Sequence, residues 1–113
     1  MQYAVLIYAP AEDTDRATSS IPGTLATLLD RPNVSGWVRL HADESATTLR
    51  NDEGRMLLTD GPFIDSKEYL AGLILIEAEN LDQALEVARE LQDARTDGAI
   101  EVRPIIEGLF RGA

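Results

Sequence analysis

Residues 69–78, YLAGLILIEA, are the part of the sequence that decides the fold. Four aliphatic residues follow one another at positions 73–76, and a short continuous apolar run of this kind is typical of a buried strand. Consecutive strand residues point to opposite faces, so the run predicts a strand that is apolar on both faces. Such a strand belongs in a sheet that is covered on both sides.

Three further strands are predicted for the same sheet. Residues 2–9 are apolar at both odd and even positions, and Pro10 ends this run. Residues 36–40 form a shorter strand-like segment, and residues 99–106 alternate between apolar and charged side chains near their start. We expect the strand at residues 2–9 to lie in the sheet interior, because both of its faces are apolar.

A β-hairpin is predicted between these strands, over residues 46–50 and 55–59. Its connector at residues 51–54, NDEG, consists of residue types that favour tight turns. The sequence therefore places two or three strands in the middle of the chain.

Two helices are predicted. The first is short and runs from about residue 22 to residue 30, where three leucines fall at helical spacing. The second begins after Asn80, a residue type that caps helices, and Gln83 stands three positions later, as in a capping box. Its apolar side chains form a single stripe, at Leu81, Ala84, Leu85, Ala88 and Leu91.

The order of these elements predicts an α+β domain of ferredoxin-like, βαββαβ type over residues 1–113. We expect an antiparallel sheet with both helices on one face. Two helices cannot cover both faces, although the first and central strands are apolar on both sides. The simplest cover for the second face is the sheet of another subunit, so we expect a homodimer.

Composition excludes several classes of protein. Twenty acidic residues against ten basic ones give a net charge of -10, which repels nucleic acids and anionic membranes. No apolar run approaches the roughly 18 residues of a membrane span, and no basic leader is visible, so we expect a cytoplasmic protein. The absence of cysteine excludes disulfides, thiolate metal sites and cysteine nucleophiles.

The most informative motif is TDGPF at residues 59–63, followed by DSKE at residues 65–68 and by Gly72. This stretch closely resembles the signature of the DGPF-motif, YCII-related family, and several other segments are similar to that family in order and spacing. They are residues 3–8, 46–50, 81–94 and 101–104. The resemblance implies a ferredoxin-like fold and pairing as a dimeric α+β barrel. Some members of the wider YCII group use a His and Asp pair in catalysis, but that His matches no position here.

The residues of this motif have the chemistry of a rigid turn. Asp60 is suited to an Asx-type turn, Gly61 to a positive φ, Pro62 stiffens the backbone and Phe63 is expected to anchor the turn in the core. The turn has either this structural role alone or a further one, in which it presents Asp60, Ser66 and Lys67 at the edge of a cleft.

Three charged or titratable residues elsewhere are candidates for a site. His41 is the only histidine and suits general acid or base catalysis, but it is equally interpreted as a solvated side chain. Lys67 is the only lysine and suits an anionic ligand or a salt bridge. Arg103 belongs either in a cleft or in an ion pair with Glu101 or Glu77. One histidine among scattered carboxylates has no metal-ligand spacing, so neither a metal nor a cofactor is predicted.

The leading hypothesis is a dimeric domain that binds a small molecule and has an accessory or regulatory role, with Asp60, Ser66, Lys67 and Arg103 as ligand-binding residues. The first alternative is a cofactor-independent lyase, isomerase or hydrolase acting on a small aromatic or carbonyl compound. It would use His41 or Asp60 as the base and Lys67 or Arg103 to stabilise negative charge. The second alternative is a purely structural interaction module. Convergence of His41, Asp60 and Lys67 on one cavity would favour the enzyme.

Overall fold

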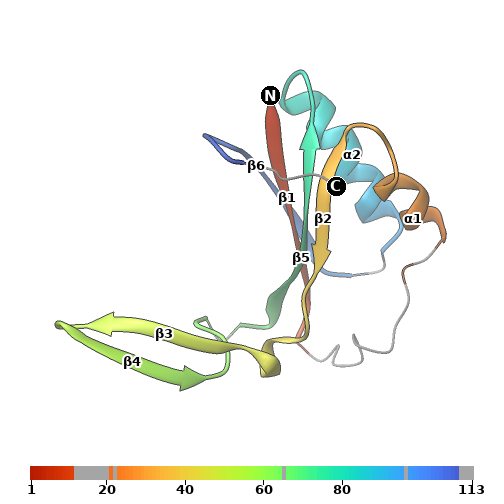
Figure 1. Cartoon of the computed structure of the whole chain (residues 1–113). Coiled ribbons are helices and arrows are strands. Elements are labelled where there is room, and N and C mark those ends of the chain that lie inside the picture. Colours follow the sequence, from red (N-terminus) through yellow and green to blue (C-terminus); the bar gives the residue numbers. More distant parts are fainter. Residues whose placement is uncertain (12–20, 22, 65, 96, 110–113) are drawn as a thin grey trace.

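The computed structural model describes residues 1–11, 21, 23–64, 66–95 and 97–109, and Figure 1 shows the arrangement of its elements. In chain order they are β1 (Gln2–Pro10), α1 (Gly23–Leu29), β2 (Val34–Arg39), the short 3₁₀ helix η1 (Asp43–Ser45), β3 (Thr47–Asp52), β4 (Arg55–Asp60), β5 (Glu68–Glu77), α2 (Leu81–Asp93) and β6 (Ala99–Pro104). None of the helices within these residues is long and apolar enough to cross a bilayer.

Four strands form the main sheet, in the order β2-β5-β1-β6, and every neighbouring pair is antiparallel. The two strands that are apolar on both faces, β1 and β5, occupy the interior of the sheet. With β3 and β4 set aside, the element order is βαββαβ, and the strand order is that of a ferredoxin-like fold. The predicted α+β fold class is therefore confirmed.

One face of the sheet is covered by both helices, which lie on the same side of it in Figure 1. Tyr3 and Val5 of β1 and Ile76 of β5 point to this face and are at most 3% exposed. They pack in one apolar cluster with Leu28 and Leu29 of α1 and with Ala84, Val87 and Leu91 of α2. Burial of these side chains is the main favourable term that holds the helices to the sheet.

The other face carries the alternate residues of the same strands and has no helix on it. In antiparallel pairs, opposed residues point to the same face, and Leu6 lies opposite Leu73 on one side and Glu101 on the other. We call this surface the open face; it comprises Gln2, Ala4, Leu6, Tyr8, Val38, Glu68, Leu70, Leu73, Leu75, Glu77, Ala99, Glu101 and Arg103. Its middle is apolar, as the sequence predicted.

Helix α2 begins as its sequence predicts. The side-chain oxygen Oδ1 of Asn80 accepts a hydrogen bond from the Gln83 amide at 3.0 Å. In return, Oε1 of Gln83 accepts from the amide of Glu79 at 2.9 Å, one residue before the position that a standard capping box uses. The first bond satisfies an amide that the first helical turn would otherwise leave without a partner, and the second fixes the residue before the cap.

The predicted hairpin is confirmed, but it forms a sheet of its own, β3-β4. Glu53 and Gly54 have φ values of 50° and 81°, and two positive φ values in a two-residue loop are typical of a type I′ turn. Figure 1 shows the hairpin leaving the main sheet on the side away from α1 and α2.

Three predicted strand boundaries need correction. The first hairpin strand, predicted to end at residue 50, continues to Asp52, which pairs with Arg55. The strand predicted from residue 36 begins at Val34, because a register shift between Val34 and Gly36 hides the start of the pairing from the sequence pattern. The strand predicted to end at residue 106 ends at Pro104, which lies opposite Tyr3. Strand β1 begins only one residue before Tyr3, so β6 runs out of partner there.

Candidate functional site

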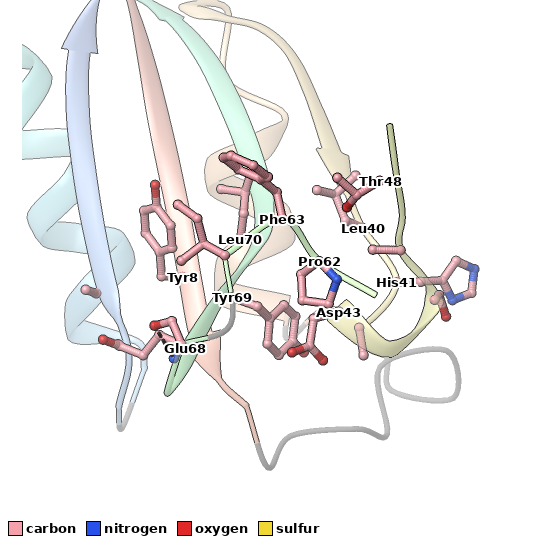
Figure 2. A pocket seen from close by; sticks show the side chains of 16 residues that line it. Tyr8, Leu40, His41, Asp43, Thr48, Pro62, Phe63, Glu68, Tyr69 and Leu70 are labelled. Atoms are coloured by element: carbon pink, nitrogen blue, oxygen red, sulfur yellow. Dashed lines mark hydrogen bonds between the residues drawn. The ribbon is translucent and has the colours of Figure 1, made fainter. Parts of the chain in front are cut away.

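A pocket of about 870 Å³ lies where the hairpin joins the main sheet, and we call it the hairpin pocket (Figure 2). Its walls come from the ends of β1, β5 and β6, from the β2–β3 connection, and from the segment after β4. The described residues that line it are Tyr8, Leu40, His41, Ala42, Asp43, Ser45, Ala46, Thr48, Pro62, Phe63, Ile64, Ser66, Glu68, Tyr69, Leu70 and Ala99.

The turn after β4 is fixed against β3 by two hydrogen bonds. The Gly61 amide donates to the carbonyl oxygen of Ala46 at 2.7 Å, and the Thr48 hydroxyl donates to the Gly61 carbonyl at 2.8 Å. The φ of Gly61 is 103°, which confirms the predicted positive value and explains why glycine suits this position. Pro62 therefore enters the pocket wall from a firmly held backbone.

Phe63 corrects one prediction, because it does not anchor the turn in the core. Its side chain is 68% exposed, and it lines the hairpin pocket instead. The helix-covered core lies on the other face of the sheet, so the turn has no route to it. An exposed aromatic ring at the mouth of a pocket is suited to contact with a ligand or with another chain.

The predicted site residues separate into two groups. His41 and Ser66 line the hairpin pocket, whereas Asp60 and Lys67 are exposed and do not. Ser66 Oγ accepts a hydrogen bond from the Glu68 amide at 3.2 Å. Lys67 is held through its backbone, since its carbonyl accepts from the Ala11 amide at 2.7 Å.

His41 stands at the edge of the pocket. Figure 2 shows its ring pointing outward, away from Tyr8 and Tyr69. No ion pair joins this ring to a carboxylate within the residues that the structure describes. A general base needs a partner that orients it, and the ion pairs of the described residues supply none for His41.

Arg103 lies on the open face and outside the pocket. Its Nη2 atom is 3.3 Å from Oε1 of Glu101, which confirms the predicted ion pair with Glu101. The same Oε1 atom accepts a hydrogen bond at 3.3 Å from the hydroxyl of Tyr8, which lines the pocket. The three side chains thus connect the pocket wall to the open face.

Tyr8 lines the hairpin pocket, although the sequence did not single it out as a candidate. Burial raises the pKa of its phenol above the usual 10.0, and the negative charge of Glu101 and the hydrogen bond to it raise the pKa further, against a lowering by Arg103. Its hydroxyl donates to Glu101 and so remains able to accept a hydrogen bond from a ligand.

The pH dependence of Tyr8 follows from this direction. A raised pKa in the folded state means that the neutral phenol stabilises the fold, and this contribution is lost as pH rises through the folded-state pKa. We expect Glu101→Gln to lower the pKa of Tyr8, because it removes the negative charge. Phenolate absorbance titration checks this, with Tyr8→Phe identifying the signal among the three tyrosines. An unchanged titration curve in Glu101→Gln would contradict the contact.

A second cavity, of about 330 Å³, lies on the helix-covered side of the sheet. Its walls are largely apolar and include Leu25 of α1, Trp37 of β2 and Leu91 of α2, while Arg39 and Arg95 stand among its polar residues. In the described part of the chain, no three His, Asp or Glu side chains are grouped closely enough to hold a metal ion.

Comparison with known proteins places this architecture in a family. The model of the family described as YCII-related domain matches residues 1–108. An uncharacterised protein of Rhizobium meliloti (strain 1021) is 33% identical to this chain over an alignment 114 residues long. The alignment covers 93% of this chain and 92% of that protein. The chain belongs to the YCII-related domain family.

Proposed function

We propose that this protein is a homodimer that binds a small molecule in the hairpin pocket, in an accessory or regulatory role. The single observation that carries the proposal is the pocket itself. Its volume of about 870 Å³ falls within the range of about 300–1,000 Å³ that small-molecule sites occupy. Its walls are mostly apolar and carry a few polar groups, which is the usual composition of such sites.

The charges of the pocket wall favour a neutral or cationic ligand. Asp43 and Glu68 contribute carboxylates, Tyr8 and Ser66 contribute hydroxyls, and the lining contains neither a lysine nor an arginine among the described residues. A carboxylate in an apolar surrounding attracts a cation more strongly than it would in water. The aromatic rim at Phe63 adds a surface on which a ring can stack.

The enzyme alternative receives less support from this geometry. It required His41, Asp60 and Lys67 to meet around one cavity, and only His41 reaches the hairpin pocket. Its ring also points outward there (Figure 2). A binding function needs no such convergence, because shape and a few hydrogen bonds are sufficient for it.

The dimeric part of the proposal rests on the open face. Its central residues, Leu6 and Leu73, lie in the interior strands of the sheet, and no helix covers them. A water-exposed apolar sheet face of this kind is typical of an interface. Light scattering is expected to give twice the chain mass of 12.4 kDa.

Three ligands with the same ring and different charges test the pocket: benzylamine, benzyl alcohol and benzoate. We expect benzylamine and benzyl alcohol to raise the melting temperature at millimolar concentration, and benzoate to do so least, because of Asp43 and Glu68. Asp43→Asn should reduce the shift with benzylamine, and Ser66→Ala should reduce the shift with benzyl alcohol.

Lys67→Ala is the matched control for these variants, because Lys67 is exposed and outside the lining. It should leave all three shifts unchanged. If benzoate gave the largest shift and Lys67→Ala abolished it, the ligand site would lie at the lysine and not in the hairpin pocket.

A further inference from the structure

We infer that the β3–β4 hairpin is an arm that packs its apolar face on the open face of a second copy of this chain, and that this contact closes the hairpin pocket. The inference rests on the proposed dimer and names the element that completes it. The arm denotes residues Thr47–Asp52 and Arg55–Asp60 with their turn.

The arm receives little support from its own subunit. All of its strand residues are exposed except Thr48, which is half-buried, and its strands pair with each other but not with the main sheet. An isolated two-stranded hairpin is marginally stable in water. A hairpin of this length is therefore expected to be stabilised by a surface that its own subunit does not provide.

The two faces of the arm differ in chemistry. Leu49 lies opposite Leu58, and Met56 follows on the same face; their side chains are 60%, 69% and 70% exposed. The other face carries two arginines, Arg50 and Arg55, together with threonines, an aspartate and a single leucine, Leu57. The Leu49 face therefore has the composition of an interface, and the opposite face has that of a solvated surface.

Charge identifies a second copy as the occupant. Two chains that each carry a net charge of -10 repel one another unless they meet through surfaces that lack acidic residues. The middle of the open face is such a surface, because the residues there are apolar. Of its acidic residues, Glu101 pairs with Arg103 and Glu77 pairs with the N-terminal ammonium group. Glu68 lies at the end of the face, where β5 begins. Asp60 is the only charged residue on the apolar face of the arm. A basic partner would instead bind the acidic surfaces.

The arm also enlarges the area that is available to an interface. Four strands about 4.8 Å apart and about 20 Å long present a face of about 400 Å². A stable dimer of standard size buries about 800 Å² per partner, so the open face alone supplies about half of this. One face of the two-stranded arm adds about 200 Å² per subunit on the same geometry.

The position of the arm brings these surfaces together. It leaves the main sheet on the side away from the helices, and so borders the open face (Figure 1). The hairpin pocket lies at the corner between them, and its rim residues Phe63 and Ile64 are 68% and 70% exposed. A second copy seated in this corner covers that rim and turns an open pocket into an enclosed one.

Cross-linking between singly substituted chains tests this arrangement, since the chain contains no cysteine of its own. Met56→Cys marks the apolar face of the arm, while Val38→Cys and Ala99→Cys mark the two edges of the open face. The Met56→Cys chain is mixed with each open-face variant in turn and treated with a short bis-maleimide. Mixed subunits can be joined only across the interface, and Glu86→Cys on the exposed side of α2 is the control.

We expect Met56→Cys to cross-link to at least one open-face variant and not to Glu86→Cys. In parallel, Leu58→Gln should raise the dimer dissociation constant about ten-fold or more, whereas Leu57→Gln, on the opposite face of the arm, should change it little.

The outcomes separate the inference from the proposed function. A dimer in which Met56→Cys joins neither open-face variant, and in which the Leu58 and Leu57 variants behave alike, overturns the arm while leaving the proposed dimer intact. A monomer by light scattering overturns both. Binding of benzylamine to a monomer would preserve only the pocket.

Discussion

Gly98→Ala is expected to lower the melting temperature by about 10–20 °C, the largest effect of any single-methyl substitution considered for this chain. Gly98 joins α2 to β6 and has a φ of 84°, a conformation that side chains other than glycine rarely adopt. A Cβ atom there would overlap the backbone carbonyl oxygen of Tyr8 and would lie 2.5 Å from Nη2 of Arg95. Backbone on one side and a bonded guanidinium on the other leave little room for relaxation.

The same corner depends on Arg95, so the clash affects more than one contact. Its Nη2 atom donates to the Tyr8 carbonyl at 2.6 Å, and Nη1 donates to Gln92 Oε1 at 3.3 Å. Gln92 in turn donates to the Gly98 carbonyl at 3.0 Å. Strain of about 1–2 kcal/mol from the left-handed backbone adds to an overpacking cost of about 1–3 kcal/mol.

Gly54→Ala is the matched control for this substitution. Gly54 has a φ of 81°, nearly the same as that of Gly98, but nothing lies within 4 Å of the position where its Cβ would be. It should therefore show the backbone strain alone, and denaturant unfolding followed by circular dichroism measures both variants. Equal losses of stability would mean that the corner relaxes and that the predicted overlap has no energetic consequence.

The sheet could be predicted from sequence because its interior strands carry their evidence locally. The aliphatic run at residues 73–76 and the apolar segment at residues 2–9 leave each strand apolar on both faces, whichever neighbour it pairs with. Asn80 and Gln83 identify the start of α2 in the same local way, through hydrogen bonds between residues three positions apart. Such signals do not depend on the rest of the chain.

The separation of the hairpin from the main sheet could not be predicted in this way. The alternation within β3 and β4 and the turn at Glu53 and Gly54 specify that the two strands pair with each other. They do not specify whether a third strand joins them. Whether the hairpin joins the main sheet depends on the length of the segments that connect it to the sheet. It also depends on which strands lie at the sheet edges, and the sequence pattern reveals neither.

The candidate site was predictable only in part, for a related reason. Ser66 and His41 line the hairpin pocket, but so does Tyr8, whose partner Glu101 is 93 residues away in sequence. Pairing of β1 with β6 brings the two side chains together on the open face. The alternation of side chains along β1 and β6 shows which residues share a face. It predicts the contact of Tyr8 with Glu101 only once the two strands are known to be neighbours.

Leu91→Ala is expected to destabilise the protein by about 2–5 kcal/mol, because Leu91 anchors α2 to the sheet. Its side chain is 1% exposed, packs in the main apolar cluster and lines the second cavity, so truncation enlarges a space that already exists. Neighbouring side chains therefore have little to collapse onto, and the cost should fall in the upper part of this range.

Leu81→Ala provides the comparison, because it removes the same atoms from the same helix at a side chain that is 48% exposed. Both variants replace leucine by alanine, so the change in helix propensity is small in each, and their difference reports burial at Leu91. Urea unfolding should give a clearly lower midpoint for Leu91→Ala and a shift of at most about 1 kcal/mol for Leu81→Ala. If the two variants lost equal stability, α2 would not be held to the sheet by its buried stripe.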